Sequence, residues 1–268
     1  MRQQSTRLLA SVAMTAILAA GLGGCQTMSD ITGSISPKSS ASAETDSRQA
    51  VDVTGERYRA DPKNAEAALA YGQALRASGQ RSQAAAVLEQ ATIAHPGDKA
   101  LLAGYGRALA DNGNFQQAFD VLNRAHSPDN PDWRLLSVQG TTLDQLGRHD
   151  EARRYYESAL KIVPGEPSVL SNLGLSYVLS KNLPKAEEAL RQAYASGRAD
   201  ARVRQNLALV IGLQGRFAEA EQIVRADLPP DEATANVAYL KQMLNRSKDD
   251  PRVGAAGKTP LASLSRPE

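Results

Sequence analysis

Glycine recurs at even intervals along this chain, inside segments whose pattern is helical. The members of this series are Gly72, Gly106, Gly140 and Gly174, with Ala208 at the next position. Two alanine series share the interval, namely Ala84, Ala118, Ala152, Ala186 and Ala220, and Ala91, Ala125, Ala159 and Ala193. Glycine inside a helix costs about 1 kcal/mol relative to alanine. Because that cost recurs in register, we expect each small residue to lie where two helices approach closely.

Each interval contains two predicted helices joined by a turn. The turns contain Gly79, Gly113, Gly147 and Gly215, and the second helices end near Pro96, Pro131, Pro164 and Pro229, where proline stops a helix. The fourth interval differs, because its turn has Lys181 and Asn182 in place of glycine. Aromatic residues make up only 4% of the chain, while hydrophobic residues, many of them alanine, make up 42%. This composition favours closely packed helices over a thick aromatic core.

A 34-residue interval filled by two helices resembles the tetratricopeptide repeat, or TPR. The resemblance covers residues 65–230 with five repeats, which start near Ala65, Lys99, Trp133, Pro167 and Ala201. It implies an all-α superhelical solenoid of helix-turn-helix repeats. We predict that residues 49–64 form the second helix of a partial leading repeat and that residues 231–247 form a capping helix, which an open-ended stack requires. Residues 248–268 are polar, with scattered Gly and Pro, and are predicted to be disordered.

The N-terminus has the pattern of an export signal. Arg2 and Arg7 precede an apolar run of 15 residues, which is short for a membrane span of about 20 residues. Residues 1–24 are therefore predicted to be a signal peptide. Gly23 and Gly24 precede Cys25, the only cysteine, in a pattern that resembles the bacterial lipobox. The alternative is an ordinary signal peptide that contains a cysteine.

The lipobox resemblance implies that Cys25 carries several acyl chains, such as palmitate, and stable anchoring needs more than one chain. By the same resemblance, Gln26 is not the aspartate that retains many lipoproteins in the inner membrane. We therefore expect lipid anchoring at the periplasmic face of the outer membrane. Residues 25–48, which begin with the lipidated cysteine, are rich in serine and are predicted to form a flexible tether.

Charge and motif content argue against several classes of function. The formal net charge is +2, and basic and acidic residues balance once residues 1–24 are excluded. A nucleic-acid-binding protein needs a clustered basic face, so we predict no nucleic-acid partner. The three histidines lack metal-ligand spacing, and no catalytic constellation is recognisable. We predict no metal, no cofactor and no enzymatic activity.

The first helix of each repeat is expected, by resemblance to the family, to line a concave face. In repeats one to three, the inward positions are mostly polar or small and include Arg76, Arg107, Arg134, Asp144 and Gln145. In repeats four and five they are Asn172, Leu175, Val178 and Leu179, then Arg202, Gln205, Asn206, Leu209 and Leu213. The apolar residues with the two asparagines suit an amphipathic partner segment.

Two other interpretations of this face remain open. The Leu and Val side chains could instead pack against the capping helix or a neighbouring repeat, since apolar residues at helical spacing are more often core. The arginines could favour an acidic tail, as in carboxylate-clamp members of the family, although the full clamp pattern is not present. We favour a partner-binding groove on the concave face of repeats four and five. Its predicted residues are Asn172, Leu175, Val178, Leu179, Arg202, Asn206, Leu209 and Leu213.

A lipid-anchored repeat array resembles the TPR lipoproteins that assist outer-membrane machines. The signal, lipobox, Ser-rich segment and single array are similar to the assembly lipoprotein of the tight-adherence (Flp) pilus system, of the TadD type. This resemblance implies a protein-binding scaffold whose partner is a secretin or another pilus assembly component. Alternatives are a type IV pilus pilotin, a barrel-assembly accessory protein, or the adaptor of a cell-wall or protease enzyme. An enzyme would need an acid/base pair in the groove, where Asp144 is the candidate.

Overall fold

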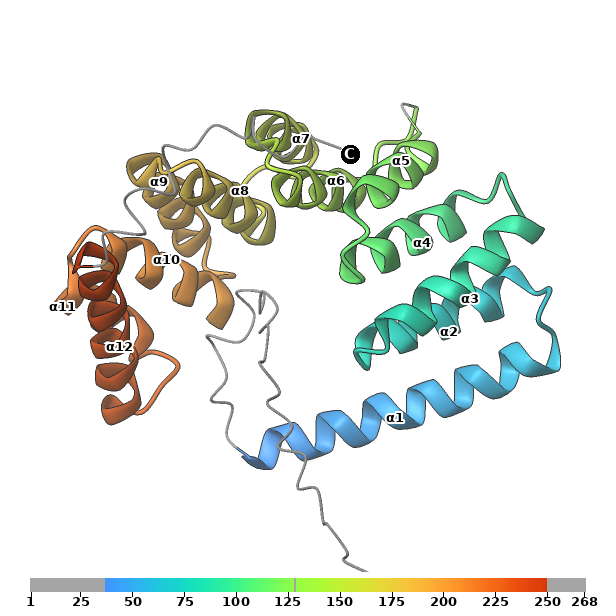
Figure 1. Ribbon diagram of the computed structural model, residues 1–268, viewed down its shortest axis with the longest axis horizontal. Helices are drawn as coiled ribbons and strands as arrows, with labels where there is room; N and C mark the ends of the chain where they lie inside the picture. Colours follow the sequence, from blue (N-terminus) through green and yellow to red (C-terminus); the bar gives the residue numbers. More distant parts are fainter. Residues whose placement is uncertain (1–36, 128, 250–268) are drawn as a thin grey trace, which may run out of the picture. The chain divides into compact units, whose positions relative to one another are not determined.

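The computed structural model describes residues 37–127 and 129–249, with side chains for residues 45–127 and 129–246. Two units divide the chain, residues 1–43 and 44–268, and only the start of one helix is described in the first unit. Every regular element in the described residues is an α-helix (Figure 1). The helices are α1 (Pro37–Ala60), α2 (Ala65–Ala77), α3 (Arg81–Ala94), α4 (Lys99–Asp111), α5 (Phe115–Ala125), α6 (Trp133–Gln145), α7 (His149–Ile162), α8 (Pro167–Leu179), α9 (Leu183–Ala195), α10 (Ala201–Leu213), α11 (Phe217–Val224) and α12 (Pro230–Asp249).

The predicted all-α repeat fold is confirmed. The first helices of the five repeats are α2, α4, α6, α8 and α10, and each begins at the residue from which its repeat was expected to start. Each start is fixed by a side chain that caps the helix N-terminus. The capping residues keep the interval of the glycine series and are Asn64, Asp98, Asp132, Glu166 and Asp200. A side-chain oxygen at this position accepts a hydrogen bond from an otherwise unpaired backbone N–H.

The evenly spaced glycines lie where the two helices of a repeat meet, as predicted. A Cβ atom added to Gly72 would lie 2.5 Å from Cγ of Leu88 on α3. At Gly174 the same atom would lie 2.7 Å from Cγ of Leu190 on α9. These distances are far inside van der Waals contact, so only glycine lets each helix pair pack this closely.

The turns within repeats use a left-handed backbone conformation. Gly79, Gly113, Gly147 and Gly215 have φ between 75° and 84°. In the fourth repeat, where glycine is absent, Lys181 adopts the same conformation with φ of 60°. Residues other than glycine pay a steric cost there. The repeat geometry therefore overrides the local preference of lysine.

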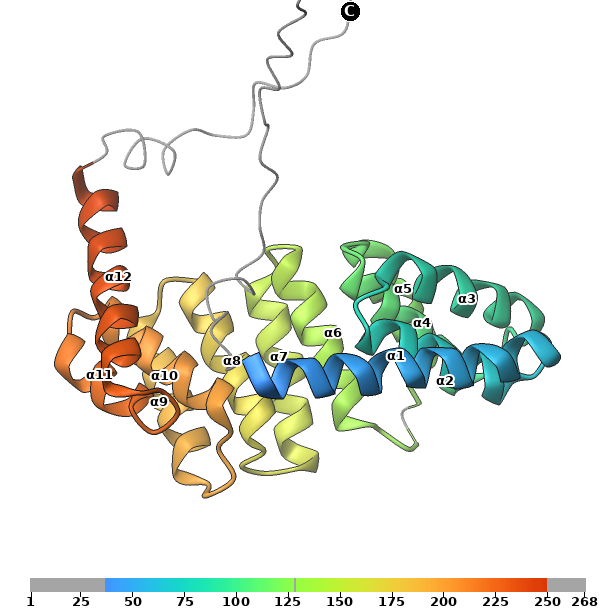
Figure 2. The ribbon, with the colours of Figure 1, turned by 90° about the horizontal axis from the view of Figure 1, so that it is seen from below.

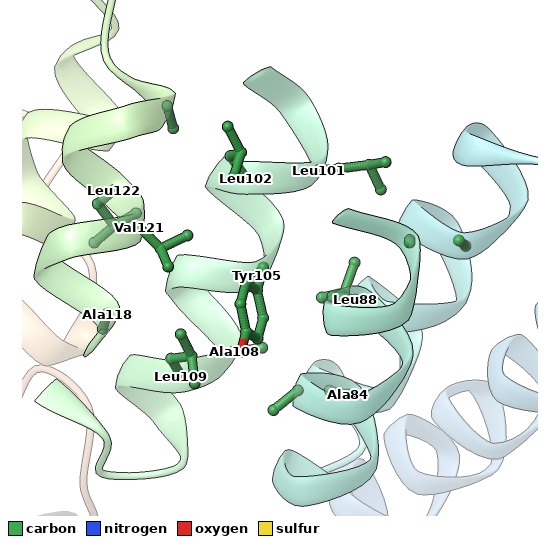
Figure 3. Close-up of a cluster of buried hydrophobic side chains, with 14 of the residues drawn as sticks. Ala84, Leu88, Leu101, Leu102, Tyr105, Ala108, Leu109, Ala118, Val121 and Leu122 are labelled. Carbon is green, nitrogen blue, oxygen red and sulfur yellow. The ribbon is translucent and has the colours of Figure 1, made fainter. Parts of the chain in front are cut away.

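Packing between repeats completes the core. Figure 3 shows the first of these contacts, in which Leu101, Tyr105 and Ala108 of α4 face α3. Leu102 and Leu109 lie on the other side of α4, towards α5. Each first helix therefore packs one row of side chains against the second helix of its own repeat and another row against the preceding repeat. Its remaining face is not used in either contact.

Helix α1 extends further than predicted. It begins at Pro37, inside the segment 25–48 that was expected to be a flexible tether, so that prediction is wrong for residues 37–48. Proline is favourable in the first turn of a helix. The other end of α1 packs on α2, where the rings of Tyr58 and Tyr71 stack with centroids 5.4 Å apart. This contact holds the C-terminal part of α1 against the array.

Helix α12 covers the end of the array. Figures 1 and 2 both place it beside α11, and it contacts α10 as well as α11. Ala233 and Val237 are buried in the same cluster as Leu207 and Ile211 of α10. Because each first helix contacts the two helices of the preceding repeat in this way, α12 takes the place that a sixth first helix would occupy.

Four predicted segments lie wholly or partly outside the described residues. They are the signal peptide at residues 1–24, the lipidation site Cys25, residues 26–36 of the predicted tether, and residues 250–268 of the predicted tail. Among the helices that the structure does describe, none combines the length and hydrophobicity required to span a membrane.

Candidate functional site

The predicted groove residues lie on two first helices in contact with each other, α8 and α10. Leu175 and Leu209 occupy equivalent places in consecutive repeats, and both are half-buried. Leu213 is also half-buried, and Leu179 retains 43% of its accessible surface. These four leucines belong to none of the buried clusters within the described residues. By repeat register they share one face of α8 and α10, and we call these four residues the leucine row.

Val178 differs from the leucine row. It is half-buried and packs against the cluster that contains Leu207 of α10 and Val237 of α12. Part of its surface therefore stabilises the end of the array. Val178 therefore follows the alternative interpretation, in which the apolar residues of this face pack against the capping helix or a neighbouring repeat.

The two predicted asparagines bind neighbouring repeats. Nδ2 of Asn172 donates to Oγ of Ser137 on α6 at 3.1 Å, and Nδ2 of Asn206 donates to Oγ of Ser171 on α8 at 2.9 Å. Both serines are buried. Each asparagine therefore uses a donor to join consecutive first helices. The sequence contained the signal, because Ser137 and Ser171 are also separated by one repeat interval.

Arg202 lies exposed in the first turn of α10. Within the described residues its side chain makes no ion pair or hydrogen bond. Arg204, two residues further, has its Nε 2.7 Å from Oδ2 of Asp227, which links α10 to the segment after α11. Of these two arginines, only Arg202 is available to a partner.

Asp144 is not a groove acid. It is buried, with 7% of its surface exposed, although its register predicted an inward-facing carboxylate. Its Oδ2 accepts a hydrogen bond from the Tyr156 hydroxyl at 2.9 Å, and its Oδ1 accepts from Ser176 Oγ at 2.8 Å. Nδ1 of His149 lies 2.9 Å from the same Oδ1. The carboxylate thus joins α6, α7 and α8, and its oxygens are occupied by protein donors.

Burial and the adjacent carboxylate of Asp144 raise the pKa of Tyr156 far above its ordinary value. The phenol therefore remains a hydrogen-bond donor throughout the physiological pH range. This cluster stabilises the junction of repeats three and four. It offers no free base or nucleophile.

Two open pockets, of about 400 and 470 Å³, lie between α1 and α2 and beside α3, α4 and α5, and neither is lined by a predicted groove residue. Within residues 45–127 and 129–246, no group of three or more His, Cys, Asp or Glu is placed to hold a metal ion. The site is thus an exposed apolar row, of a kind that suits a macromolecular segment better than a small molecule.

Family comparisons agree with this architecture. One tetratricopeptide repeat family model matches residues 134–199, and another matches residues 69–132 and 171–233. Together they cover more than half of the chain, which belongs to the tetratricopeptide repeat family. TPR proteins are generally non-enzymatic scaffolds that bind protein or peptide partners. A search of curated proteins found no match.

Solved structures of low sequence identity share the fold. PilW, described as a widely conserved type IV pilus biogenesis factor, has a TM-score of 0.64 at 19% identity, covering 72% of this chain and 91% of that chain. A thermophilic TPR protein of Thermus thermophilus has a TM-score of 0.58 at 22% identity, covering 67% and 100%. The Cut9–Hcn1 APC/C hetero-tetramer has a TM-score of 0.62 at 17% identity and 81% coverage, but this chain spans only 43% of that chain.

Proposed function

We propose that this protein is a non-enzymatic scaffold, lipid-anchored through Cys25 at the periplasmic face of the outer membrane, that assists assembly of a Flp/Tad-type pilus or its secretin. The observation that carries the proposal is the leucine row. Four large apolar side chains on two adjacent first helices lie partly exposed and outside the buried clusters of the described residues. Exposed apolar surface of this kind marks a site of protein association.

The chemistry of the row specifies the kind of partner. Leu175 and Leu209 sit in the same register on consecutive first helices, so they present apolar surface at a regular spacing. An amphipathic segment buries its apolar face in such a groove and leaves its polar face in water. Arg202, exposed at the start of α10, supplies a charge at the rim. A segment of a secretin or pilus component would meet these requirements.

The groove is tested by the double substitution Leu175→Glu with Leu209→Glu. We expect loss of co-purification with the secretin, because two carboxylates would be desolvated in the contact. Far-UV circular dichroism should be unchanged, since both side chains are only half-buried. The matched control is Ile93→Glu with Ile162→Glu, which places the same charges on exposed apolar residues outside the groove.

Two results would contradict the groove assignment. Loss of helical signal in the Leu175 and Leu209 variant would make these residues part of the core. Equal loss of secretin in the Ile93 and Ile162 variant would indicate a nonspecific effect of charge.

The membrane anchor is tested separately by Cys25→Ala. We expect this variant to leave the outer-membrane fraction, because removal of the thiol abolishes acyl attachment. Density-gradient fractionation and metabolic labelling with palmitate measure the two effects. A variant that still floats with the outer membrane would refute lipid anchoring at this residue.

The structural similarity to PilW favours a second candidate, a factor for type IV pilus biogenesis. The same groove would then bind a component of that system. Cross-linking in cells that contain both systems distinguishes the candidates by the secretin recovered. Recovery of the type IV pilus secretin alone would replace the Flp/Tad assignment and leave the scaffold proposal in place.

A further inference from the structure

Helix α1 is a second helix without its first helix in the described part of the chain. Its register is set by Asp61 and Pro62, which follow it as His95 and Pro96 follow α3. The matching first helix would need residues 31–43, one repeat interval before α2. Residues 37–43 already belong to α1, so this segment cannot supply that helix. The leading repeat is therefore only half built.

An open pocket of about 400 Å³ lies between α1 and α2, where that first helix would pack. Ala67 and Ala70 of α2 line it, at the register of Leu101 and Gly104 on α4. Gly104 faces the preceding first helix, since a Cβ atom added to it would lie 2.7 Å from Cδ1 of Leu69 on α2. The equivalent position in α2 therefore faces the place of an absent first helix.

Helix α1 leaves apolar surface uncovered beside this pocket. Val53 and Thr54 stand at the register of Val121 and Leu122 on α5, which are buried beside α4 (Figure 3). On α1, Val53 retains 43% of its accessible surface, and Thr54 lines the pocket together with Arg57. We call the pocket, with Val53 at its edge, the socket.

Helix α12 has the opposite deficiency, because it is a first helix that no second helix follows in the described residues. Ala233 and Val237 are buried against α10 and α11, and Leu240 lies against Gly212 of α10. Their spacing matches the row by which α4 packs on the preceding repeat. In this register Ala238 corresponds to the glycine that meets the second helix in a complete repeat, yet Ala238 is exposed.

The side chains of the two half-repeats fit each other in size. In repeat five Ala208 replaces the glycine and Val224 replaces the leucine that faces it, and both are buried in one cluster. Ala238 and Thr54 stand at the same two registers, and threonine has nearly the shape of valine. The Thr54 hydroxyl donates to the Ala50 carbonyl oxygen at 2.6 Å, so it would bring no unpaired donor into the contact.

Helix length indicates where the two halves would meet. The first helices of the five repeats have 13 residues each, and the second helices have 8 to 14. In contrast, α12 has 20 residues and α1 has 24. Relative to the repeats, α12 is extended at its C-terminus and α1 at its N-terminus. In an antiparallel pair these ends lie together, and helices from separate chains need no turn to join them there.

The other ends of the two helices carry opposite charge. Asp231 and Glu232 lie in the first turn of α12, and Arg57 and Arg59 lie in the last turn of α1. An antiparallel pair brings these turns together. None of the four side chains makes an ion pair within the part of the chain that the structure describes. Complementary charges at a contact set its orientation more than its affinity.

We propose that the socket of one copy binds α12 of a second copy, so that two half-repeats form a complete repeat across the junction of two chains. Such a contact is heterologous, because the two copies use different surfaces, and it generates rings or open filaments. It goes beyond the proposed function and depends on neither the leucine row nor the lipid anchor.

Cysteine cross-linking tests the contact directly. Two full-length copies with different affinity tags, one with Thr54→Cys and one with Ala238→Cys, are produced together, purified in detergent and oxidised. We expect a disulfide-linked dimer that carries both tags. The control replaces Ala238→Cys by Glu188→Cys, at an exposed position on α9, and should give no dimer. A disulfide through Cys25 would appear with both pairs and is thereby distinguished.

Sedimentation velocity of the purified full chain tests the strength of the contact. We expect a mass that rises with protein concentration. Ala238→Arg should abolish this rise and leave the melting temperature unchanged, because the residue is exposed within one copy. Arg57→Glu should also weaken association, and adding Glu232→Arg should restore it. The control Arg154→Glu, at an exposed position on α7, should associate as the unaltered chain does.

Several outcomes would overturn the proposal. The unaltered chain could remain a single copy at every soluble concentration. Efficient dimers of Ala238→Cys copies alone would indicate a symmetric contact. If Thr54→Cys in single copies resists a thiol reagent that modifies Glu188→Cys, another segment of the same chain fills the socket. Cross-linking in cells to a different protein, with no dimer of this chain, would assign the socket to a foreign helix.

Discussion

The first helices of repeats one to three and those of repeats four and five share one backbone plan but present different chemistry. Gly106 on α4 and Gly174 on α8 both face a leucine of the second helix. On the free face, Arg107 follows Gly106, whereas Leu175 follows Gly174. Positions inside the helix pair are therefore fixed by packing, while the adjacent positions vary. This difference separates the residues that specify the fold from those that specify the partner.

The largest expected effect tests whether packing is equivalent in the two regions. Gly140→Val and Gly174→Val should each destabilise the protein by about 2–3 kcal/mol, because overpacked cores must shift backbone or side chains. A Cβ at Gly140 meets the Tyr156 ring at 2.5 Å, and one at Gly174 also lies 3.2 Å from the Ala186 carbonyl oxygen. Urea denaturation measures both losses.

Gly97→Ala is the control for these glycines. No atom lies within 4 Å of a Cβ added there, so we expect unchanged or slightly higher stability. If Gly140→Val lowers the free energy of unfolding and Gly174→Val does not, the close helix contact at this glycine is required in repeat three but not in repeat four.

The second effect concerns the junction between the two regions. Asp144→Asn should cost about 1–3 kcal/mol, because the amide cannot accept all the hydrogen bonds that Tyr156, Ser176 and His149 direct to the carboxylate. The control Asp150→Asn changes an exposed acid of α7 and should cost less than about 0.5 kcal/mol. Equal costs in urea denaturation would contradict a structural role for the buried carboxylate.

Asp144 also shows where sequence reasoning reached its limit. The repeat interval was sufficient to predict the repeat starts, the close contacts at Gly72 and Gly174, and the end cap. The repeat register assigned Asp144 to the groove. Repeats one, two and four have leucine at the register of residue 156, and the register could not show that Tyr156 would bring a hydroxyl group to this carboxylate. Burial of Asp144 depends on side chains from two other helices, and these side chains do not recur at the repeat interval.

The candidate site was predictable to a similar extent. Repeat register placed Leu175 and Leu209 on one face, and the structure has them half-buried on adjacent first helices. The matched spacing of Ser137 with Ser171 and of Asn172 with Asn206 was a periodic signal for their hydrogen bonds, but the distance between consecutive first helices was needed to recognise it. The extension of α1 to Pro37 was missed because the serine-rich composition of residues 25–48 is typical of a flexible segment, whereas the helix that was predicted from residue 49 continues into it.

A smaller effect tests the turn that follows α8, in the region of the leucine row. Lys181→Gly should stabilise the protein by about 0.5–1 kcal/mol, because glycine adopts positive φ without steric cost. The reciprocal change, Gly147→Ala in the equivalent turn of repeat three, should lower stability by about 1 kcal/mol. Thermal denaturation measures both. A destabilised Lys181→Gly variant would mean that the lysine side chain contributes a contact that outweighs backbone strain.

The smallest effect concerns an ion-pair network on the second helices of repeats four and five. Glu187 stands at the register of Ala85 and Phe119 in repeats one and two and of Arg153 in repeat three, so an acidic residue at this register distinguishes repeat four from repeats one to three. Burial alone would raise the pKa of Glu187, but hydrogen bonds from Arg216, Arg191 and Gln214 outweigh it and lower the pKa to about 2. The stabilisation is therefore complete above the unfolded pKa of about 4.3 and is lost as the pH falls towards 2.

Glu187→Gln should accordingly lower stability at pH 7 by less than about 1 kcal/mol, as is usual for partly exposed ion pairs. The difference from the unaltered chain should narrow at pH 3, because the carboxylate of Glu187 then loses part of its advantage in the folded state. Urea denaturation at both pH values measures this change, and Glu188→Gln, at an exposed neighbour on α9, serves as the control. A difference that stays constant between pH 7 and pH 3 would show that Glu187 acts through packing. The outer surfaces of the two regions would then be equivalent, and only their first-helix faces would differ.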